Sequence, residues 1–393
     1  MKPPLPQDWD PTSAAALLDQ CATFDDLRER CPVAHSDFLG WSLFRHADVV
    51  RVLNDAATFS SVVSRHLSVP NGMDPPEHTG YRRIVELYFQ PARMQAFEAP
   101  CREIAASLVR DLAGPGEVEF IGALAQSFAV RVQCAFLGWP AHLHEPLRLW
   151  TQKNREASLA LDRPAMAGLA GEFAGHVKEL LQGRRGASAL GERAEGAEGA
   201  EGDIVSSLLA QQVDGRPLRD GEIASILRNW TVGEVGTISA SVGILAHYLA
   251  QHGDPQQQLR AQPSLLPEAI DEILRIHGPL VTNRRSTTRP VEVGGRQIAA
   301  GERISLNWIA ANRDPDVFEA PDTFRLGRDP AANLLYGAGI HVCPGAPLAR
   351  LELRVVMQEL LDGTAQISLP ADQPPSLAVY PASGFARLPL RVR

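Results

Sequence analysis

Residues 336–350 read YGAGIHVCPGAPLAR and place one cysteine, Cys343, between glycine-bearing turns and the start of a predicted helix. Gly337, Gly339 and Gly345 are expected to supply backbone freedom and to allow close approach to a flat ligand. Glycine suits both tasks because it reaches positive φ without a steric penalty. A cysteine before a helix N-terminus faces free N–H groups and the positive end of the helix dipole, which favour the thiolate. We therefore interpret the stretch as a metal-ligand loop.

The residues after this loop predict a helix over 346–360, because apolar side chains recur there at roughly helical spacing. A lone cysteine in a glycine-rich turn also has a simpler interpretation, that of a buried and inert side chain. The whole string, and not the cysteine alone, distinguishes the two interpretations.

That string, aromatic-Gly-x-Gly-x-His-x-Cys-x-Gly followed by a helix, resembles the haem-binding signature of the cytochrome P-450 family of haem-thiolate monooxygenases. The resemblance implies that Cys343 is the proximal ligand to the haem iron and that His341 lies against a haem propionate. It also implies that Tyr336 and Gly345 occupy cofactor-contacting positions of the loop. Thiolate ligation pushes electron density towards the iron and favours O–O cleavage, which explains why a cysteine is needed here.

Length and composition limit the remaining possibilities. The chain has 393 residues and a formal net charge of −8, with no basic cluster that would suggest nucleic acid or an anionic membrane as a partner. Its five cysteines are scattered without C-x-x-C pairs, which fits a reducing cytosol and argues against zinc, an iron–sulfur cluster or a disulfide framework. Residues 1–13 lack an apolar signal region, so a cytoplasmic location without a membrane anchor is expected.

No long polar linker divides the chain, so residues 1–393 are expected to form a single, mainly α domain with a smaller β-rich part, an α+β fold. The expected regions are a helical body and a β-rich part: 74–280 and 346–362 for the helices, and 40–70, 280–330 and 365–393 for the strands. Within these regions we expect a strand over 40–44 and helices over 14–31, 46–54 and 266–277. The low-complexity residues 186–202 are expected to form a flexible surface loop.

A second informative stretch, residues 74–83, reads DPPEHTGYRR and predicts the start of a helix. His78 and Arg82 are four residues apart and therefore share one helical face. Taken alone, they could be a solvated pair on a surface helix. The family resemblance instead implies that both side chains reach the haem propionates, where an Arg fork suits a carboxylate.

Residues 222–250 are apolar nearly all round, which is typical of a helix buried through the centre of a large protein. A membrane span is the alternative, but charged residues interrupt the stretch. In the family this helix crosses the distal face of the haem. The matching segment is VGEVGT, residues 232–237, in which Gly233 fits a widened turn and Thr237 fits the alcohol that guides protons.

The acid that usually precedes this alcohol is missing, since Gly236 stands in its place. Glu234 lies three residues before Thr237 and could supply protons through water, or it could be a buried structural carboxylate. The sequence of residues 228–250 resembles most closely the haem domains of the self-sufficient branch of the family, in which haem and reductase are fused.

Further family positions follow in the last third of the chain. Glu272 and Arg275 would alone be a weak surface ion pair, but together with Arg328 they resemble the family's structural Glu-x-x-Arg core. Arg285 matches a third propionate contact. The pocket over the haem is expected to contain mostly apolar side chains, namely Val232, Leu280, Val281 and Phe385, which suggests a small or medium hydrophobic substrate, aromatic molecules included.

The resemblance therefore implies a monooxygenase with haem b that inserts one atom of O2 into an organic substrate, for example by hydroxylation or O-dealkylation. Electrons from NAD(P)H would arrive through a separate ferredoxin and its reductase, or through a fused reductase outside these residues, because no dinucleotide fingerprint is present. Two alternatives are a peroxide-driven haem-thiolate enzyme, suggested by Gly236, and a haem-binding sensor without turnover. The sequence specifies no oligomeric state.

Overall fold

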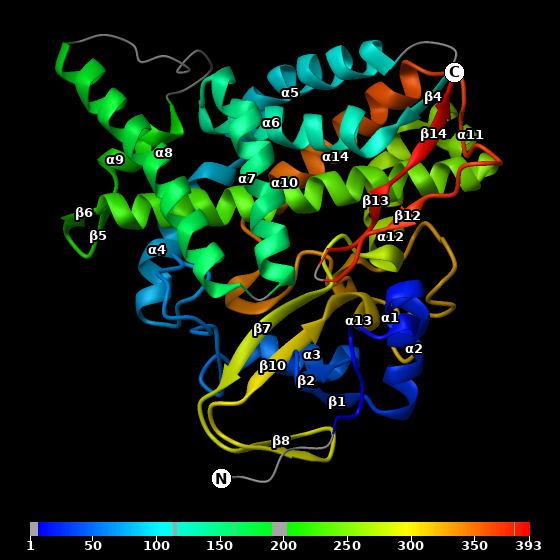
Figure 1. Cartoon of the computed structure of the whole chain (residues 1–393), viewed down its shortest axis with the longest axis horizontal. Helices are drawn as coiled ribbons and strands as arrows, with labels where there is room; N and C mark the ends of the chain where they lie inside the picture. Colours follow the sequence, from blue (N-terminus) through cyan, green and yellow to red (C-terminus); the bar gives the residue numbers. More distant parts are fainter. Residues whose placement is uncertain (1–6, 113–115, 161, 191–202, 381) are drawn as a thin grey trace.

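The computed structural model describes residues 7–112, 116–160, 162–190, 203–380 and 382–393. Figure 1 shows the long helix α10 (Asp220–Gln251) running across the whole molecule. Helices lie along one side of it, and the largest sheet lies on the other side. The structure is thus mainly helical with a smaller β part, as the sequence predicts.

Thirteen further α-helices are present in the described residues, and several begin and end where the sequence predicts. In chain order they are α1 (Ala14–Leu18), α2 (Gln20–Arg30), α3 (His46–Asn54), α4 (Glu77–Glu86), α5 (Pro91–Leu112), α6 (Ser127–Leu137), α7 (His144–Leu159), α8 (Arg163–Leu190), α9 (Ile204–Ala210), α11 (Gly253–Ala261), α12 (Leu266–His277), α13 (Trp308–Asn312) and α14 (Ala346–Asp362). A π-helical turn, Ile121–Gln126, precedes α6.

The strands form one five-stranded sheet, one three-stranded sheet and three two-stranded pairs. Their order is β1-β2-β10-β7-β3, then β11-β14-β4, with pairs β12-β13, β5-β6 and β8-β9. Their bounds are β1 (Val33–Ser36), β2 (Gly40–Leu43), β3 (Phe59–Ser60), β4 (Gly116–Glu119), β5 (Gln212–Val213), β6 (Arg216–Pro217), β7 (Thr282–Thr287), β8 (Val291–Val293), β9 (Arg296–Ile298), β10 (Arg303–Asn307), β11 (Ile367–Ser368), β12 (Ser376–Leu377), β13 (Phe385–Arg387) and β14 (Pro389–Val392). In the large sheet β10 is parallel to β2, and the other neighbours are antiparallel.

Two predicted element boundaries are wrong. The predicted helix over 14–31 is divided into α1 and α2 at Asp19, whose side chain accepts a hydrogen bond from Ala22 N and thereby caps the second helix. The predicted loop over 186–202 begins too early, since residues 186–190 complete α8. Residues 191–202 lie outside the described part of the chain.

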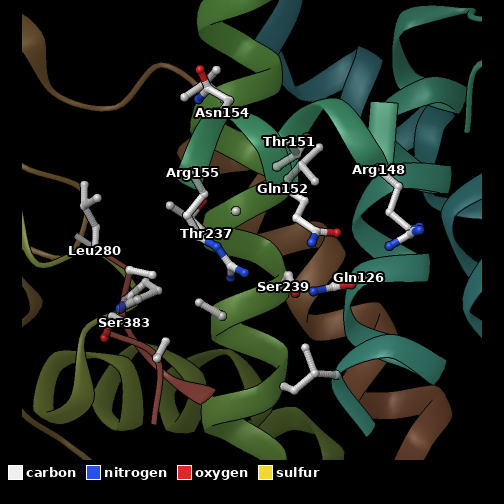
Figure 2. Close-up of a pocket in the computed structure, with 18 of the residues that line it drawn as sticks. Gln126, Arg148, Thr151, Gln152, Asn154, Arg155, Thr237, Ser239, Leu280 and Ser383 are labelled. Carbon is white, nitrogen blue, oxygen red and sulfur yellow. The ribbon is translucent and has the colours of Figure 1, made fainter. Parts of the chain in front are cut away.

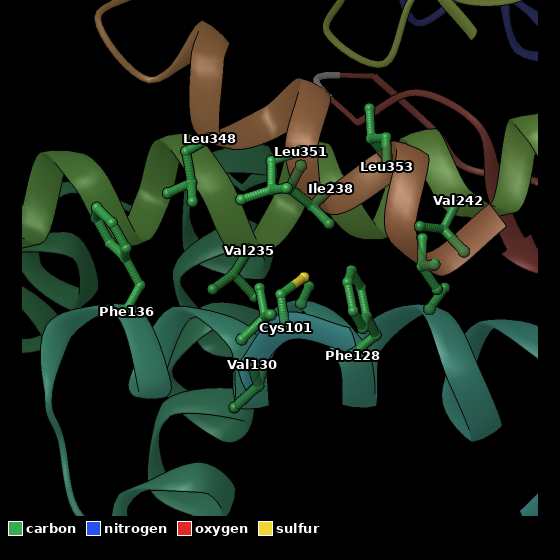
Figure 3. Packing of buried hydrophobic residues seen from close by; sticks show 14 of the residues in the cluster. Cys101, Phe128, Val130, Phe136, Val235, Ile238, Val242, Leu348, Leu351 and Leu353 are labelled. Carbon is green, nitrogen blue, oxygen red and sulfur yellow. The ribbon is translucent and has the colours of Figure 1, made fainter. Parts of the chain in front are cut away.

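The core is built around α10, which packs against α6, α12 and α14. Figure 3 shows Val235, Ile238 and Val242 of α10 facing side chains from neighbouring helices, Leu351 of α14 and Phe128 of α6 among them. Burial on several sides explains why α10 is apolar nearly all round. No helix in the described residues is long and apolar enough to cross a membrane.

Candidate functional site

The loop before α14 is held by backbone hydrogen bonds and by two glycines. The N–H group of Cys343 donates to the carbonyl of Tyr336 at 2.8 Å, which closes the loop. Gly337 and Gly339 have φ values of +71° and +68°, as predicted for left-handed turns. At Gly339 a Cβ would also collide with the carbonyl oxygen of Leu53, so no other residue fits there without moving the backbone.

Gly345 differs from the other two glycines, because its φ is −81° and any residue can adopt that value. The expectation that it supplies conformational freedom is therefore wrong. A Cβ at this position would lie 3.8 Å from the sulfur of Cys343 and 3.7 Å from the ring of Phe89. Gly345 is also the N-cap residue of α14. Because it has no side chain, the space beside the sulfur stays open.

The thiol of Cys343 is subject to two opposed influences. Its side chain is exposed, and yet desolvation deep in the molecule raises its pKa, which indicates that it opens onto an interior space and not onto the outer surface. The N–H groups of Gly345 and Ala346 and the charge of Arg82 act in the opposite direction. A positive ion bound at the sulfur would reinforce these donors and complete the stabilisation of a thiolate.

Apolar side chains are exposed on α10 and on the cysteine loop. On α10, Val232 is 43% exposed, and a Cβ added at Gly233 or Gly236 would meet no atom within 4 Å. On the cysteine loop, Ile340 and Val342 are 38% and 40% exposed. Exposed apolar side chains in the middle of a large protein indicate a binding surface for a flat apolar ligand.

At one edge of this space lies a cluster of buried nitrogen groups. The rings of His78 and His341 are 4.4 Å apart, and the Nε2 atom of each is buried without a partner among the described residues. The pKa of His341 is lowered to about 4, mainly by burial and to a smaller extent by the positive charges of His78 and Arg285. Arg285 is itself buried, and desolvation lowers its pKa. The charge of Asp74 acts on His341 and Arg285, but its carboxylate accepts hydrogen bonds from Ser60 and Ser61. Because the two Nε2 atoms have no partner in the described part of the chain, the cluster suits bound carboxylates.

Arg82 and Tyr336 contact the cysteine loop. Arg82 donates to the carbonyl of Val342 at 2.6 Å and to Glu86 at 2.7 Å, so it ties α4 to the residue before Cys343. The hydroxyl of Tyr336 is buried and has no hydrogen-bond partner among the described residues. Arg350 lies 4.4 Å from the centre of its ring, which fixes the ring from the other side.

Thr237 lies on the exposed stripe of α10, next to Gly233 and Gly236. Its hydroxyl donates to the carbonyl of Gly233 at 2.5 Å, with a second contact to the carbonyl of Glu234 at 3.2 Å. Because its proton is held by the backbone, the oxygen lone pairs are available to accept a hydrogen bond from a bound molecule.

The carboxyl of Glu234 turns towards α6 and α14. The Gln133 amide, oriented with its nitrogen towards this carboxyl, donates to its Oε1 atom at 2.8 Å. Glu352 of α14, which is fully buried, is its other neighbour. Desolvation raises the pKa of Glu234 to about 8, and burial together with Glu234 raises that of Glu352 as well. At neutral pH the pair therefore retains protons. The sequence analysis missed Glu352, because its position in a helix gives no sign of a buried carboxyl partner.

A cavity of about 440 Å³ lies between α10, α7 and the β12-β13 region (Figure 2). Three of the four predicted pocket residues line it, namely Val232, Leu280 and Phe385, and Thr237 lies in its wall. Val281 does not line it and is fully buried in a separate cluster with Phe44 and Ile309. The reason is the extended backbone, in which consecutive side chains point to opposite sides. The sequence analysis also missed the polar side chains that α7 contributes, Arg155 among them.

Glu272, Arg275 and Arg328 form a largely buried cluster, whereas the i, i+3 spacing of the first two would alone indicate a surface ion pair. The Nε atoms of Arg275 and Arg328 each lie 2.8 Å from the carboxylate of Glu272. Arg275 also donates to the carbonyl of Asn312 at 2.6 Å and lies over the ring of Phe318. This cluster joins α12 to the segments that lead into the cysteine loop.

These features fit an iron porphyrin. The loop offers a thiol flanked by N–H donors, and apolar side chains are exposed on the loop and on α10. In the described part of the chain the Nε2 atoms of His78 and His341 have no partner, and the buried cation Arg285 adds a positive charge for two propionates. The glycines of the loop and of α10 leave room for a flat ring.

Known proteins share this fold and sequence. Residues 244–381 match the family model described as cytochrome P450. The chain is 32% identical over 366 residues to the erythromycin C-12 hydroxylase of Saccharopolyspora erythraea, covering 91% of this chain and 89% of that one. It is 30% identical over 362 residues to the cyclomarin C epoxidase CymV of Salinispora arenicola, with 88% of each chain covered. A solved structure of a mutant of P450 EryK in complex with erythromycin B has a TM-score of 0.83, with 30% identity and 96% of each chain covered. The chain therefore belongs to the cytochrome P450 family and is a haem-thiolate monooxygenase.

Proposed function

We propose that Cys343 ligates the haem iron and that His78, His341 and Arg285 receive the propionates, with Arg82 and Tyr336 holding the loop in place. The observation that carries this proposal is the set of buried, unpartnered nitrogen atoms of His78 and His341 beside a thiol loop. When bound, the haem supplies the activation of dioxygen. The protein orients the cofactor and the substrate, and it controls water and protons.

On the distal side, Thr237 is proposed to accept and pass protons at its hydroxyl oxygen, whose own proton is held by the backbone. Glu234 keeps a protonated carboxyl nearby, since its pKa is about 8. Its contacts with Gln133 and Glu352 also tie three helices together, so the carboxyl is proposed to act both as a proton store and as a structural group.

The proposed substrate is an organic molecule with a hydrophobic body, because Val232, Leu280 and Phe385 line the cavity. We propose that the electrons for the oxygenation reaction come from NAD(P)H through a separate ferredoxin or flavoprotein. The finer likeness to the self-sufficient branch rests on residues 228–250 alone and receives no support from the relatives described above. All five cysteines are free, which supports a cytoplasmic location.

A peroxide-driven reaction is a second candidate, and one observation favours it. Gly236 replaces the acid beside Thr237 and leaves open space on that side of α10. Turnover with hydrogen peroxide, without any turnover with a reduced ferredoxin, would favour this candidate over the dioxygen reaction.

The haem assignment is tested by the absorption difference spectrum of the reduced protein with and without carbon monoxide. The expected result is the red-shifted Soret band of a thiolate complex, which Cys343→Ser abolishes. Cys31→Ser is the matched control, since Cys31 donates to the carbonyl of Val33 at 3.7 Å and packs against a separate core cluster with Phe24 and Phe44. A thiolate band that persists in Cys343→Ser would refute the proposal.

A further inference from the structure

The cavity beside Thr237 has walls of different character. Val232 of α10, Leu280 and Phe385 supply its main apolar surface, whereas α7 supplies the most polar wall, including both arginines. Isolated neutral polar groups, those of Gln126, Thr237, Ser239 and Ser383, lie elsewhere in the lining. Figure 2 shows Gln152, Asn154 and Arg155 projecting from α7, with the guanidinium of Arg155 pointing into the cavity. A molecule that fills this space must therefore be apolar on one side and polar on the other.

Charge on the polar side is not balanced. The cavity contains two arginines, and none of the described residues that line it is Asp or Glu. Arg148 is already compensated, because it forms a two-pronged ion pair with Glu145 at 2.7 and 2.8 Å. Arg155 makes no ion pair or hydrogen bond with any residue in the described part of the chain. The cavity therefore carries one uncompensated positive charge.

Most other polar side chains of α7 are already engaged. The hydroxyls of Thr151 and Ser158 donate to backbone carbonyls of their own helix at 2.9 and 2.7 Å, and Gln152 donates to Glu156 at 3.0 Å. The amides of Gln126 and Asn154 are neutral donors of the lining, so the guanidinium of Arg155, with five N–H donors in a planar fork, is the one cationic donor without an acidic partner among the described residues that line the cavity.

We propose that the substrate is an amphipathic organic carboxylate and that Arg155 binds its carboxylate group. This inference rests on the proposed function, since it assigns the substrate class of the same site. A single planar fork matches one carboxylate bidentately, whereas a doubly charged phosphate would leave an unpaired negative charge against apolar walls. The hydrophobic body then lies along Val232, Leu280 and Phe385, so oxidation falls on the body and not at the carboxylate.

The test compares acids with uncharged amides of the same shape, using the haem-loaded enzyme. Dodecanoic acid is paired with dodecanamide, and 4-butylbenzoic acid with 4-butylbenzamide. Dissociation constants are measured by the haem spin-state shift and independently by equilibrium dialysis. For at least one pair the dissociation constant of the acid is expected to be about tenfold lower than that of the amide, or lower still. A hydrogen bond between charged groups strengthens binding by about this factor. Raising the salt concentration should reduce the preference.

Three variants locate the preference. Arg155→Gln is expected to weaken binding of the acid by about tenfold and to leave binding of the amide within about threefold, while Arg155→Lys keeps part of the preference. Lys153→Gln removes the same charge from the same helix, but Lys153 does not line the cavity and is expected to change neither ligand.

Equal binding of acid and amide by the wild type, or an equal effect of Arg155→Gln on both, would overturn the inference. These outcomes are separable from failure of the proposed function. If the carbon monoxide spectrum shows thiolate ligation while acids have no advantage, only the substrate class is wrong. If the thiolate band is missing, the haem site itself has been misassigned.

Discussion

Replacing Glu234 by glutamine should change how the stability of the protein depends on pH. The carboxyl lies against Gln133 and the fully buried Glu352, and desolvation raises its pKa from 4.5 to about 8. Between these values the folded state keeps a proton that the unfolded state releases. The free energy of unfolding therefore falls as the pH rises, by about 1.4 kcal/mol per pH unit for one such group.

Because Glu234 also raises the pKa of Glu352, the titration belongs to the pair, and between pH 5 and pH 8 the part that depends on Glu234 is on the order of a few kcal/mol. Glu234→Gln keeps the shape of the side chain and removes its titration. Between pH 5 and pH 8 the free energy of unfolding of the variant should therefore rise, relative to that of the wild type, by about that amount. Urea unfolding of the haem-loaded proteins, followed by circular dichroism and by haem absorbance, measures this difference. Coinciding transitions justify a two-state treatment.

Glu98→Gln provides the matched control. The ion pairs of Glu98 with Arg354 and Arg102 lower its pKa, so it titrates below the tested range and its removal should leave the slope between pH 5 and pH 8 unchanged. If the curves of Glu234→Gln and the wild type stay parallel over this range, the carboxyl does not hold a proton in the folded state, and its role as a proton store fails with it.

Three further predictions concern other parts of the site. Thr237→Ala should lower product formation on the order of a hundredfold and divert electrons to hydrogen peroxide, whereas Ser239→Ala should do neither. If both variants form the same amount of product per electron consumed, the proton route lies elsewhere. Gly339→Ala should reduce haem retention in a dialysis assay, while Gly295→Ala, with positive φ but open space around it, should lose only some stability. Arg275→Met should cost about 3 to 5 kcal/mol in unfolding experiments, because it leaves Glu272 buried beside a single remaining cation; a loss below about 1 kcal/mol would show the cluster to be unimportant.

Local sequence determined the main elements and the cysteine loop. The apolar periodicity of residues 46–54 and 266–277 is enough to set the bounds of α3 and α12, since amphipathic helices encode their own exposed and buried faces. Gly337 and Gly339 could be assigned to left-handed turns, because only glycine adopts them without strain. The fold itself was predicted through the resemblance of a set of motifs, namely the cysteine loop, the His78 helix and the central helix, to the cytochrome P450 family.

Tertiary structure decided which neighbours each side chain meets. Leu280 and Val281 are equally apolar, but only the direction of the extended backbone places the first in the cavity and the second in the core. The pairing of Glu234 with Glu352 depends on the packing of α10 against α14, across a long separation in sequence. Arg155 looks in the sequence like any cation on a polar helix face, and only the position of α7 over the cavity directs it inward. Local periodicity fixes the elements, whereas contacts between distant segments fix the chemistry of the site.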